Sequence, residues 1–241
     1  MSRTSADSMV DLTSEMSALW AGLGPAPSRG GRMVLIVSAV SGEGASTVAR
    51  EYARLAAVRA RRPVWLIDAD LDQPGQMEAV AQAPERFGRL SKAALASPDG
   101  SCFFDVHPPV KSRDGRIVPT ARLLTARSCL GGRLWVSRFA AETLRVGQRV
   151  EASPDPAYWN ALRPHAETVV VDCPSADRSD AALILAPLAD AVVLVVAAES
   201  TGADAAGALR HEVEAVGGRI AGVVLNRTAW SPPSFLKRLT G

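Results

Sequence analysis

The sequence predicts an α/β protein with a doubly wound, mainly parallel β-sheet that is flanked by helices. Short, continuous apolar runs such as AVVLVVA (191–197) are typical of parallel strands that are buried on both faces. Helical patterns with one apolar face separate these runs, so right-handed crossovers are expected to connect the strands. Several runs end in a glycine-containing turn or in aspartates, at the sheet edge where such proteins bind ligands.

The composition favours one domain with short tails. The chain has 241 residues, of which 47% are hydrophobic, and this is enough for one sizeable core. We predict an N-terminal segment and linker at 1–31, a single domain at 32–230 and a C-terminal tail at 231–241. The three cysteines have no Cys-x-x-Cys spacing, which argues against a disulfide framework or a zinc site. No apolar stretch reaches the roughly 18 residues of a membrane span, so we expect a cytoplasmic protein.

The first part of the chain alternates between strand and helix. A short helix from Thr13 to Leu23 precedes a linker rich in Gly and Pro. The strand Met33 to Ser38 leads through a turn into a helix that continues to Ala57 with one apolar stripe. The next strand, Pro63 to Asp68, changes from apolar to acidic at its end. From Pro84 to Arg133 the periodicity fades and turn residues are frequent, so we assign no elements there.

Regular patterns return in the second part of the chain. Helix-start residues and apolar faces at a 3.6-residue period indicate four helices, and apolar runs indicate four strands. The predicted helices are 141–150, 155–164, 180–188 and 201–216, and the predicted strands are 134–136, 168–172, 191–197 and 219–225.

The turn after the first strand has the features of a phosphate-binding loop. Gly42 and Gly44 allow the backbone to turn tightly and to present its N–H groups. Ser46 and Thr47 open a helix whose positive dipole end faces the same point. A phosphate loop is written G-x-x-x-x-G-K-[ST], and here Ala45 occupies the position of the lysine that neutralises the β- and γ-phosphates.

Aspartates follow two of the predicted strands. Asp68 and Asp70 end one strand, and Asp172 ends another. The carboxyl ends of parallel strands meet at the ligand-binding edge of a sheet, so these carboxylates are expected near the phosphate loop.

Three motifs, SGEGAST, LIDADLDQP and VVVDCPSA, agree in order and spacing with one family. They resemble the phosphate loop, the second acidic motif and the Walker-B strand of bacterial tyrosine kinases that partner polysaccharide co-polymerases. These kinases belong with the cell-division and partition ATPases of the MinD and ParA type. The resemblance continues to IAGVVLNR, leaves Pro84 to Leu134 unmatched, and implies a P-loop NTPase-like domain that binds ATP or ADP with Mg²⁺.

The resemblance also implies roles for individual residues. Asp68, Asp70 and Asp172 are placed like the family's catalytic carboxylates, and Ser46, Asp68 and Asp172 like its Mg²⁺ ligands. Asn226 and Arg227 lie where the family recognises adenine. The phosphate-binding positions are Gly42, Glu43, Gly44, Ala45, Ser46 and Thr47.

The chain departs from the family at two points. Ala45 removes the phosphate-contacting lysine, which could cost about 3 kcal/mol of transition-state stabilisation. The kinases carry a tyrosine-rich C-terminal tail as phosphate acceptor, whereas the only tyrosines here are Tyr52 and Tyr158. We therefore interpret the chain as a degenerate kinase-like protein, with weak or absent ATP turnover and no tyrosine autokinase tail. It would be a cytoplasmic accessory or regulator of exopolysaccharide or capsule synthesis and export.

The partner that the resemblance implies is an inner-membrane polysaccharide co-polymerase or chain-length regulator, and assembly into a homo-oligomer is compatible with the family. The alternative function is an active MinD/ParA-type ATPase that tolerates Ala45 and cycles on a membrane or DNA surface.

Two features bear on surfaces that the protein could bind. Between Val110 and Val150 the chain is locally basic, although its formal net charge is only +2. This segment could meet anionic lipid, nucleic acid or an acidic partner, but it is also explained as a solvated arginine-rich surface. It lacks a nucleic-acid recognition motif, so we expect no nucleic-acid partner.

The tail residues resemble the end of the MinD membrane-targeting helix. They would give weak, reversible binding at the inner membrane, and the alternative is a plain C-terminal turn. The residues concerned are Phe235, Leu236, Lys237, Arg238 and Leu239.

Overall fold

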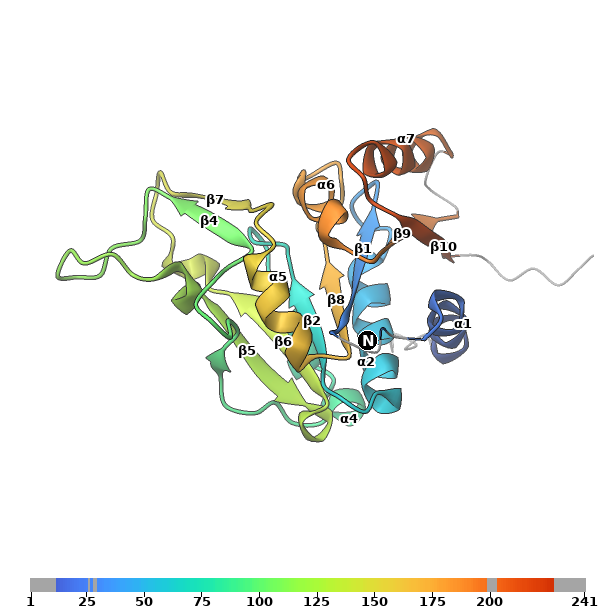
Figure 1. The fold of residues 1–241 in the computed structure, drawn as a ribbon, viewed down its shortest axis with the longest axis horizontal. Helices are drawn as coiled ribbons and strands as arrows, with labels where there is room; N and C mark the ends of the chain where they lie inside the picture. Colours follow the sequence, from blue (N-terminus) through green and yellow to red (C-terminus); the bar gives the residue numbers. More distant parts are fainter. Residues whose placement is uncertain (1–11, 26, 28–29, 199–202, 228–241) are drawn as a thin grey trace, which may run out of the picture.

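A computed structural model describes residues 12–25, 27, 30–198 and 203–227, and these residues build an eight-stranded sheet with helices on both faces (Figure 1). The strand order is β10-β9-β1-β8-β2-β6-β5-β3. Neighbours from β10 to β6 run parallel, whereas β5 is antiparallel to both β6 and β3. The predicted fold class is therefore confirmed. The strands are β1 (Arg32–Ser38), β2 (Val64–Asp68), β3 (Ala94–Leu95), β5 (Leu124–Cys129), β6 (Leu134–Phe139), β8 (Thr168–Asp172), β9 (Ala191–Ala197) and β10 (Ile220–Asn226).

The central strands are the apolar runs of the sequence. All residues of β2 and β8 are buried, and β1 lies between β8 and β9. Successive side chains of β1 pack into different cores. Val34 and Ile36 contact the helices of one face, and Met33, Leu35 and Val37 contact those of the other. Since both faces are covered, an alternating polar residue would be buried without a partner, which explains the continuous apolar pattern.

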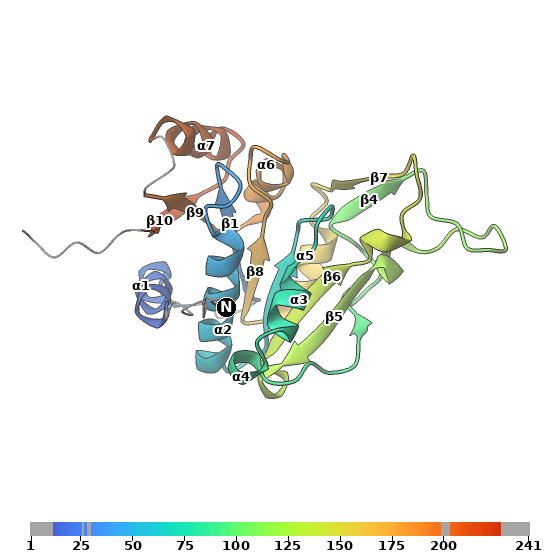
Figure 2. The same ribbon diagram turned by 180° about the vertical axis from the view of Figure 1, so that it is seen from behind.

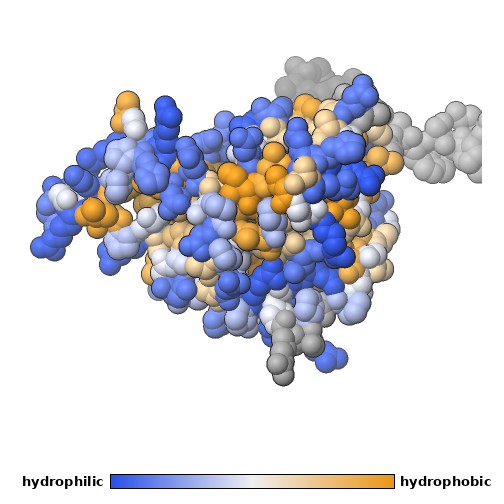
Figure 3. Space-filling model, turned by 45° about the horizontal axis from the view of Figure 1, so that its top comes forward, coloured by the Kyte–Doolittle hydropathy of each residue, from blue (hydrophilic) through white to orange (hydrophobic). Residues whose placement is uncertain are grey.

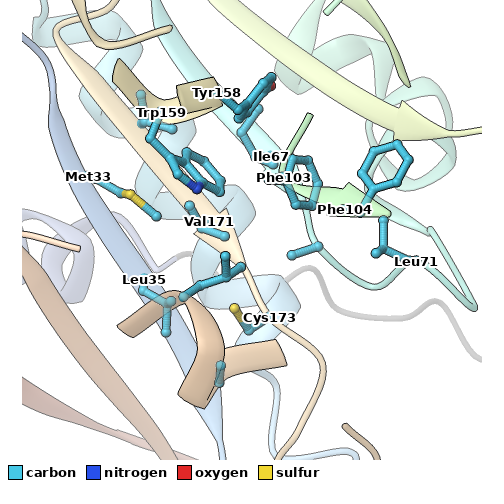
Figure 4. Packing of buried hydrophobic residues seen from close by; sticks show 14 of the residues in the cluster. Met33, Leu35, Ile67, Leu71, Phe103, Phe104, Tyr158, Trp159, Val171 and Cys173 are labelled. Carbon is cyan, nitrogen blue, oxygen red and sulfur yellow. The ribbon is translucent and has the colours of Figure 1, made fainter. Parts of the chain in front are cut away.

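Each face of the sheet has its own helical layer. The helices α1 (Thr13–Leu23), α2 (Ala45–Arg59), α3 (Gln76–Ala81) and α4 (Pro84–Phe87) cover one face (Figure 2). The helices α5 (Ala157–Leu162), α6 (Ala181–Leu185) and α7 (Ala203–Ala215) cover the other. Figure 4 shows the second core. In it, Trp159 of α5 lies near Met33 and Val171, whereas Cys173 lies near Leu35. Short 3₁₀ turns lie at Thr120–Leu123, Leu130–Gly132, Ala141–Thr143, Arg163–His165 and Ala186–Leu188.

The helix predicted over 141–150 is wrong. This segment has only the 3₁₀ turn Ala141–Thr143, and then the strand β7 (Arg149–Ala152), which pairs antiparallel with β4 (Phe104–His107). Gly147 has a positive φ of 87°, which interrupts a helix, and pairing with β4 then decides the conformation of the following residues. The weakly periodic region 84–133 supplies α4, β3, β4 and β5, and so builds the antiparallel part of the structure.

A loop projection extends beyond the β4–β7 ribbon (Figure 1). We call residues 108–118 and 144–148 the basic arm. Its two segments are joined by hydrogen bonds from Gln148 Nε2 to Pro108 O (2.8 Å) and from Arg145 Nη2 to Lys111 O (3.4 Å). The arm is mainly hydrophilic on the face that Figure 3 shows, although Ile117 and Val146 are exposed apolar residues of the arm.

Two tryptophans mark the point where the sheet changes from parallel to antiparallel. Trp65 of β2 stacks on Trp135 of the neighbouring strand β6, with ring centroids 5.3 Å apart and planes 13° apart. Trp65 and Trp159 are buried, as expected of core aromatics.

The predicted N-terminal helix is confirmed as α1, which packs on α2 and buries Met16. No helix among the described residues is long and apolar enough to span a membrane. The membrane-binding segment predicted at 235–239 lies outside the described residues.

Candidate functional site

The phosphate-loop motif connects β1 to α2 at the carboxyl edge of the sheet (Figure 1). Gly42 and Gly44 have φ values of 86° and 96°, a conformation that favours glycine. The first hydrogen bond of α2 runs from Val48 N to Gly44 O (3.0 Å). The N–H groups of residues 45–47 therefore precede the first helical hydrogen bond and can bind phosphate oxygens, aided by the helix dipole.

A buried carboxylate fastens this loop to the sheet. The side chain of Glu43 is 2% exposed, and its two oxygens accept hydrogen bonds from Val40 N (2.8 Å) and from Ala197 N (3.0 Å) at the end of β9. The carbonyl of Glu43 accepts a hydrogen bond from Asn226 Nδ2 (2.8 Å) at the end of β10. A Cβ atom on Gly44 would lie 2.1 Å from the same Asn226 nitrogen. The loop is therefore held in shape by two neighbouring strands.

The loop borders a cavity of about 320 Å³. Ala45 and both predicted hydroxyl residues, Ser46 and Thr47, line this cavity, so the position of the missing lysine faces the space where phosphates would bind. The cationic side chains among its described lining residues are Arg178 and Arg227. The other lining residues are Ser38, Ser41, Gly42, Gly44, Asp70, Cys173, Pro174 and Ser175.

The structure brings two of the three predicted carboxylates together. Asp68 and Asp172 are register partners on the adjacent strands β2 and β8, and both are buried. Asp68 accepts hydrogen bonds from the backbone N–H groups of Asp70 (3.2 Å) and Gln76 (2.8 Å). Asp172 Oδ2 accepts one from Gln76 Nε2 (2.6 Å), whereas Asp172 Oδ1 has no partner among the described residues.

Asp70 lines the same small cavity as this pair, but its carboxylate forms a salt bridge with Arg178. The Nη1–Oδ2 distance is 2.9 Å and the Nη2–Oδ1 distance is 3.3 Å. Arg178 belongs to the segment after β8, so this salt bridge joins the segments after two strands, and both residues line the cavity.

The buried carboxyl pair is electrostatically unfavourable without a cation. Burial raises the pKa of Asp68 well above its ordinary value, and the neighbouring Asp172 raises it further. Burial also raises the pKa of Asp172, although the hydrogen bond from Gln76 and the nearby hydroxyl of Ser46 oppose the shift. A divalent cation would relieve both effects. The unpartnered Asp172 oxygen and the nearby Ser46 hydroxyl are oxygen ligands of the kind that Mg²⁺ prefers, so these residues fit the metal.

Three residues at the site escaped sequence-based prediction. Gln76 is buried among the carboxylates and donates to Asp172 Oδ2 and to Ser46 O (2.8 Å). Arg50 of α2 donates to Gln76 Oε1 (3.1 Å) and lines a smaller cavity of about 160 Å³ that the carboxylates share. Arg178 is the third. Their positions depend on how separate loops converge, and the only local signal was that Gln76 follows the turn after the acidic motif.

Comparison with solved structures identifies the fold. The chimerical protein CapA2B2 has a TM-score of 0.60 at 17% identity, with 92% of this chain and 88% of that chain covered. The kinase domain of Escherichia coli tyrosine kinase Etk has a TM-score of 0.56 at 14% identity, with coverage of 90% and 76%. A nucleotide-binding protein from Archaeoglobus fulgidus in complex with ADP has a TM-score of 0.53 at 16% identity, with coverage of 92% and 74%.

The chain shares the fold of bacterial tyrosine kinase domains. No protein-family model and no curated protein matches the sequence. At these identities the similarity shows the kinase-domain fold and leaves the roles of individual side chains to be argued from the site itself. The phosphate loop, Asp68 and Asp172 lie together at one edge of that fold, as the motifs predict.

Proposed function

We propose that the protein is a degenerate kinase-like P-loop protein that binds ADP or ATP with Mg²⁺, turns over ATP slowly or not at all, and regulates polysaccharide export. The observation that carries this proposal is that the backbone of the phosphate loop is retained around Ala45. Gly42, Gly44, the helix N-terminus and the anchors to β9 and β10 are present, while the lysine is replaced. Backbone N–H groups can hold phosphates without the lysine, but stabilisation of charge during phosphoryl transfer is weakened.

Mg²⁺ would be held by Ser46 and Asp172, with Asp68 beside them. When bound, the metal would supply positive charge to the phosphates. Gln76 orients Asp172 through its amide, and two backbone N–H groups, one on each oxygen, keep the Asp68 carboxylate in place. Asn226 supports the phosphate loop directly, because its amide donates to Glu43 O and its oxygen accepts from Arg227 N (2.9 Å). Recognition of adenine by Asn226 and Arg227 remains part of the proposal.

The positions of both tyrosines support a function other than tyrosine autophosphorylation. Tyr52 and Tyr158 are the only tyrosines of the chain, and both are buried. Burial raises the pKa of Tyr52 to about 12. A buried hydroxyl cannot reach the active site of another copy without unfolding of its surroundings. The regulatory role would therefore depend on binding, with an inner-membrane co-polymerase as the proposed partner.

Calorimetric titration with Mg·ADP and Mg·ATP, together with a phosphate-release assay, tests the nucleotide part of this proposal. We expect the native protein to bind both nucleotides and release phosphate slowly. Ala45→Lys should bind more tightly, by about ten-fold or more, because a charge-assisted hydrogen bond to phosphate is restored. Rapid phosphate release by the native protein, abolished by Asp68→Ala, would instead favour the active ATPase.

The partner is tested separately by co-expression with a two-span membrane co-polymerase. Copurification that survives Asp172→Asn would support a role through binding. Loss of copurification in this variant would tie the partner to an intact carboxylate site and contradict the binding-only role.

A further inference from the structure

The position of Arg178 suggests how the site compensates for the missing lysine. Arg178 lines the same cavity as the loop residues Gly44, Ala45 and Ser46. Its side chain is 35% exposed, so a ligand in the cavity can reach the guanidinium. The salt bridge with Asp70, a residue that is itself partly buried, holds the guanidinium beside the cavity.

The other arginines near the site are less suited to contact the phosphates. Arg50 is mostly buried beside the carboxylates and donates to Gln76 and Thr47. Arg227 also lines the cavity, but its exposed side chain forms no salt bridge among the described residues, so nothing there fixes its position. Among the described cations that line this cavity, Arg178 is therefore the one that a salt bridge also holds in position.

We propose that Arg178, which lies outside the phosphate loop, supplies the positive charge that this loop lacks. It would do so by binding the β-phosphate of a nucleoside diphosphate. This inference rests on the proposed nucleotide-binding function. A planar guanidinium with several N–H donors matches a phosphate group as well as it matches the carboxylate of Asp70. In the absence of nucleotide, the salt bridge to Asp70 keeps the Arg178 guanidinium beside the cavity. When nucleotide binds, the more highly charged phosphate competes with Asp70 for the guanidinium.

A double-mutant cycle between positions 45 and 178 tests this inference. ADP and AMP binding would be measured by calorimetry for the native protein, Arg178→Ala, Ala45→Lys and the double variant. We expect Arg178→Ala to weaken ADP binding about ten-fold and AMP binding much less, because AMP lacks the β-phosphate. In the Ala45→Lys background the same substitution should change ADP binding by less than about two-fold, because the lysine supplies the charge. The fold-changes follow from the usual strength of one charge-assisted hydrogen bond.

Arg210→Ala is the matched control, because Arg210 also forms a 2.9 Å salt bridge, with Glu214 on the exposed face of α7. It should leave ADP binding unchanged. An equal loss in both backgrounds, or native-like ADP binding by Arg178→Ala, would overturn the inference while leaving the proposed function intact. Failure of both the native protein and Ala45→Lys to bind ADP would instead contradict the proposed function.

Discussion

At the scale of single residues, the pairing of Asp68 with Asp172 gives the protein an unusual dependence on pH. Both carboxyl groups have raised pKa values in the folded state because of burial, and each ionised group disfavours the other. A carboxyl group with a raised folded pKa keeps a proton that the unfolded chain releases above about pH 4. The contribution of this pair to the free energy of unfolding therefore decreases as pH rises from about 4 through the raised pKa values.

Asp172→Asn should make the protein more stable at alkaline pH. The amide oxygen can keep the hydrogen bond from Gln76, and the substitution removes the negative charge beside Asp68. We expect urea unfolding to show a gain of at least ~1 kcal/mol at pH 8 and little difference at pH 4. Asp72→Asn, at an exposed position, is the control. Parallel pH profiles for the native protein and Asp172→Asn would contradict the electrostatic explanation.

The two loop glycines allow the cost of backbone strain to be measured separately from the cost of a steric clash. Gly42 and Gly44 both have positive φ, but an added Cβ meets no atom within 4 Å at Gly42 and meets Asn226 Nδ2 at 2.1 Å at Gly44. Gly42→Ala should cost about 1–2 kcal/mol of unfolding free energy through backbone strain. Gly44→Ala should cost about 1 kcal/mol more, since it also displaces the Asn226 hydrogen bond.

Chemical denaturation of both glycine variants measures this difference. Asn226→Ala, which removes the conflicting atom, should bring the additional cost at Gly44 close to zero. Equal costs for Gly42→Ala and Gly44→Ala would show that contact between the loop and β10 is unimportant for stability.

At the scale of elements, burial explains which predictions from the sequence are accurate. The strands β8 and β9 coincide with their apolar runs, because both faces of each strand pack against helices. The strands β3, β4, β5 and β7 were missed or mistaken, since they lie toward one edge or in a separate ribbon, and their conformation depends on long-range pairing. The strand β3 has only two residues, both exposed, and β4 and β7 alternate over only four residues each, so the local signal is too short to predict their pairing.

The residues of the candidate site also divide into those that could be predicted from the sequence and those that could not. The phosphate loop and the aspartates at the ends of β2 and β8 could be predicted, because each follows its strand directly in sequence. The contributions of Gln76 and Arg178 depend on where two loops meet in space, and no spacing rule connects them to Asp172 or Asp70. The adenine contact of Asn226 and Arg227 remains a prediction. The domain boundaries also remain predictions.

At the scale of the whole molecule, the basic arm is separate from the nucleotide site. None of its residues is among the described residues that line the phosphate cavity. Its tip is closed locally, by hydrogen bonds such as Ser112 N to Arg116 O (2.8 Å). Replacing residues 112–116 by two glycines, which suit a tight hairpin turn, should therefore change ADP affinity by less than about two-fold and stability by about 0.5 kcal/mol or less.

Calorimetry and urea unfolding of the shortened protein check both values. A large decrease in ADP affinity would show that the arm communicates with the cavity. If affinity is unchanged, the shortened protein can be used to ask whether the arm contacts a membrane or a protein partner, with nucleotide binding as the internal standard.

The stacked indoles of Trp65 and Trp135 give the protein a built-in optical reporter. Two indoles whose ring centroids are 5.3 Å apart couple their electronic transitions, so they should produce a paired band in the circular dichroism spectrum that isolated tryptophans lack. Because β2 carries Asp68 at its end and β6 begins the antiparallel part, this band reports on the seam between the two halves of the sheet. Circular dichroism spectroscopy without any added label could therefore show whether nucleotide binding at the parallel half of the sheet changes the structure where the antiparallel half begins.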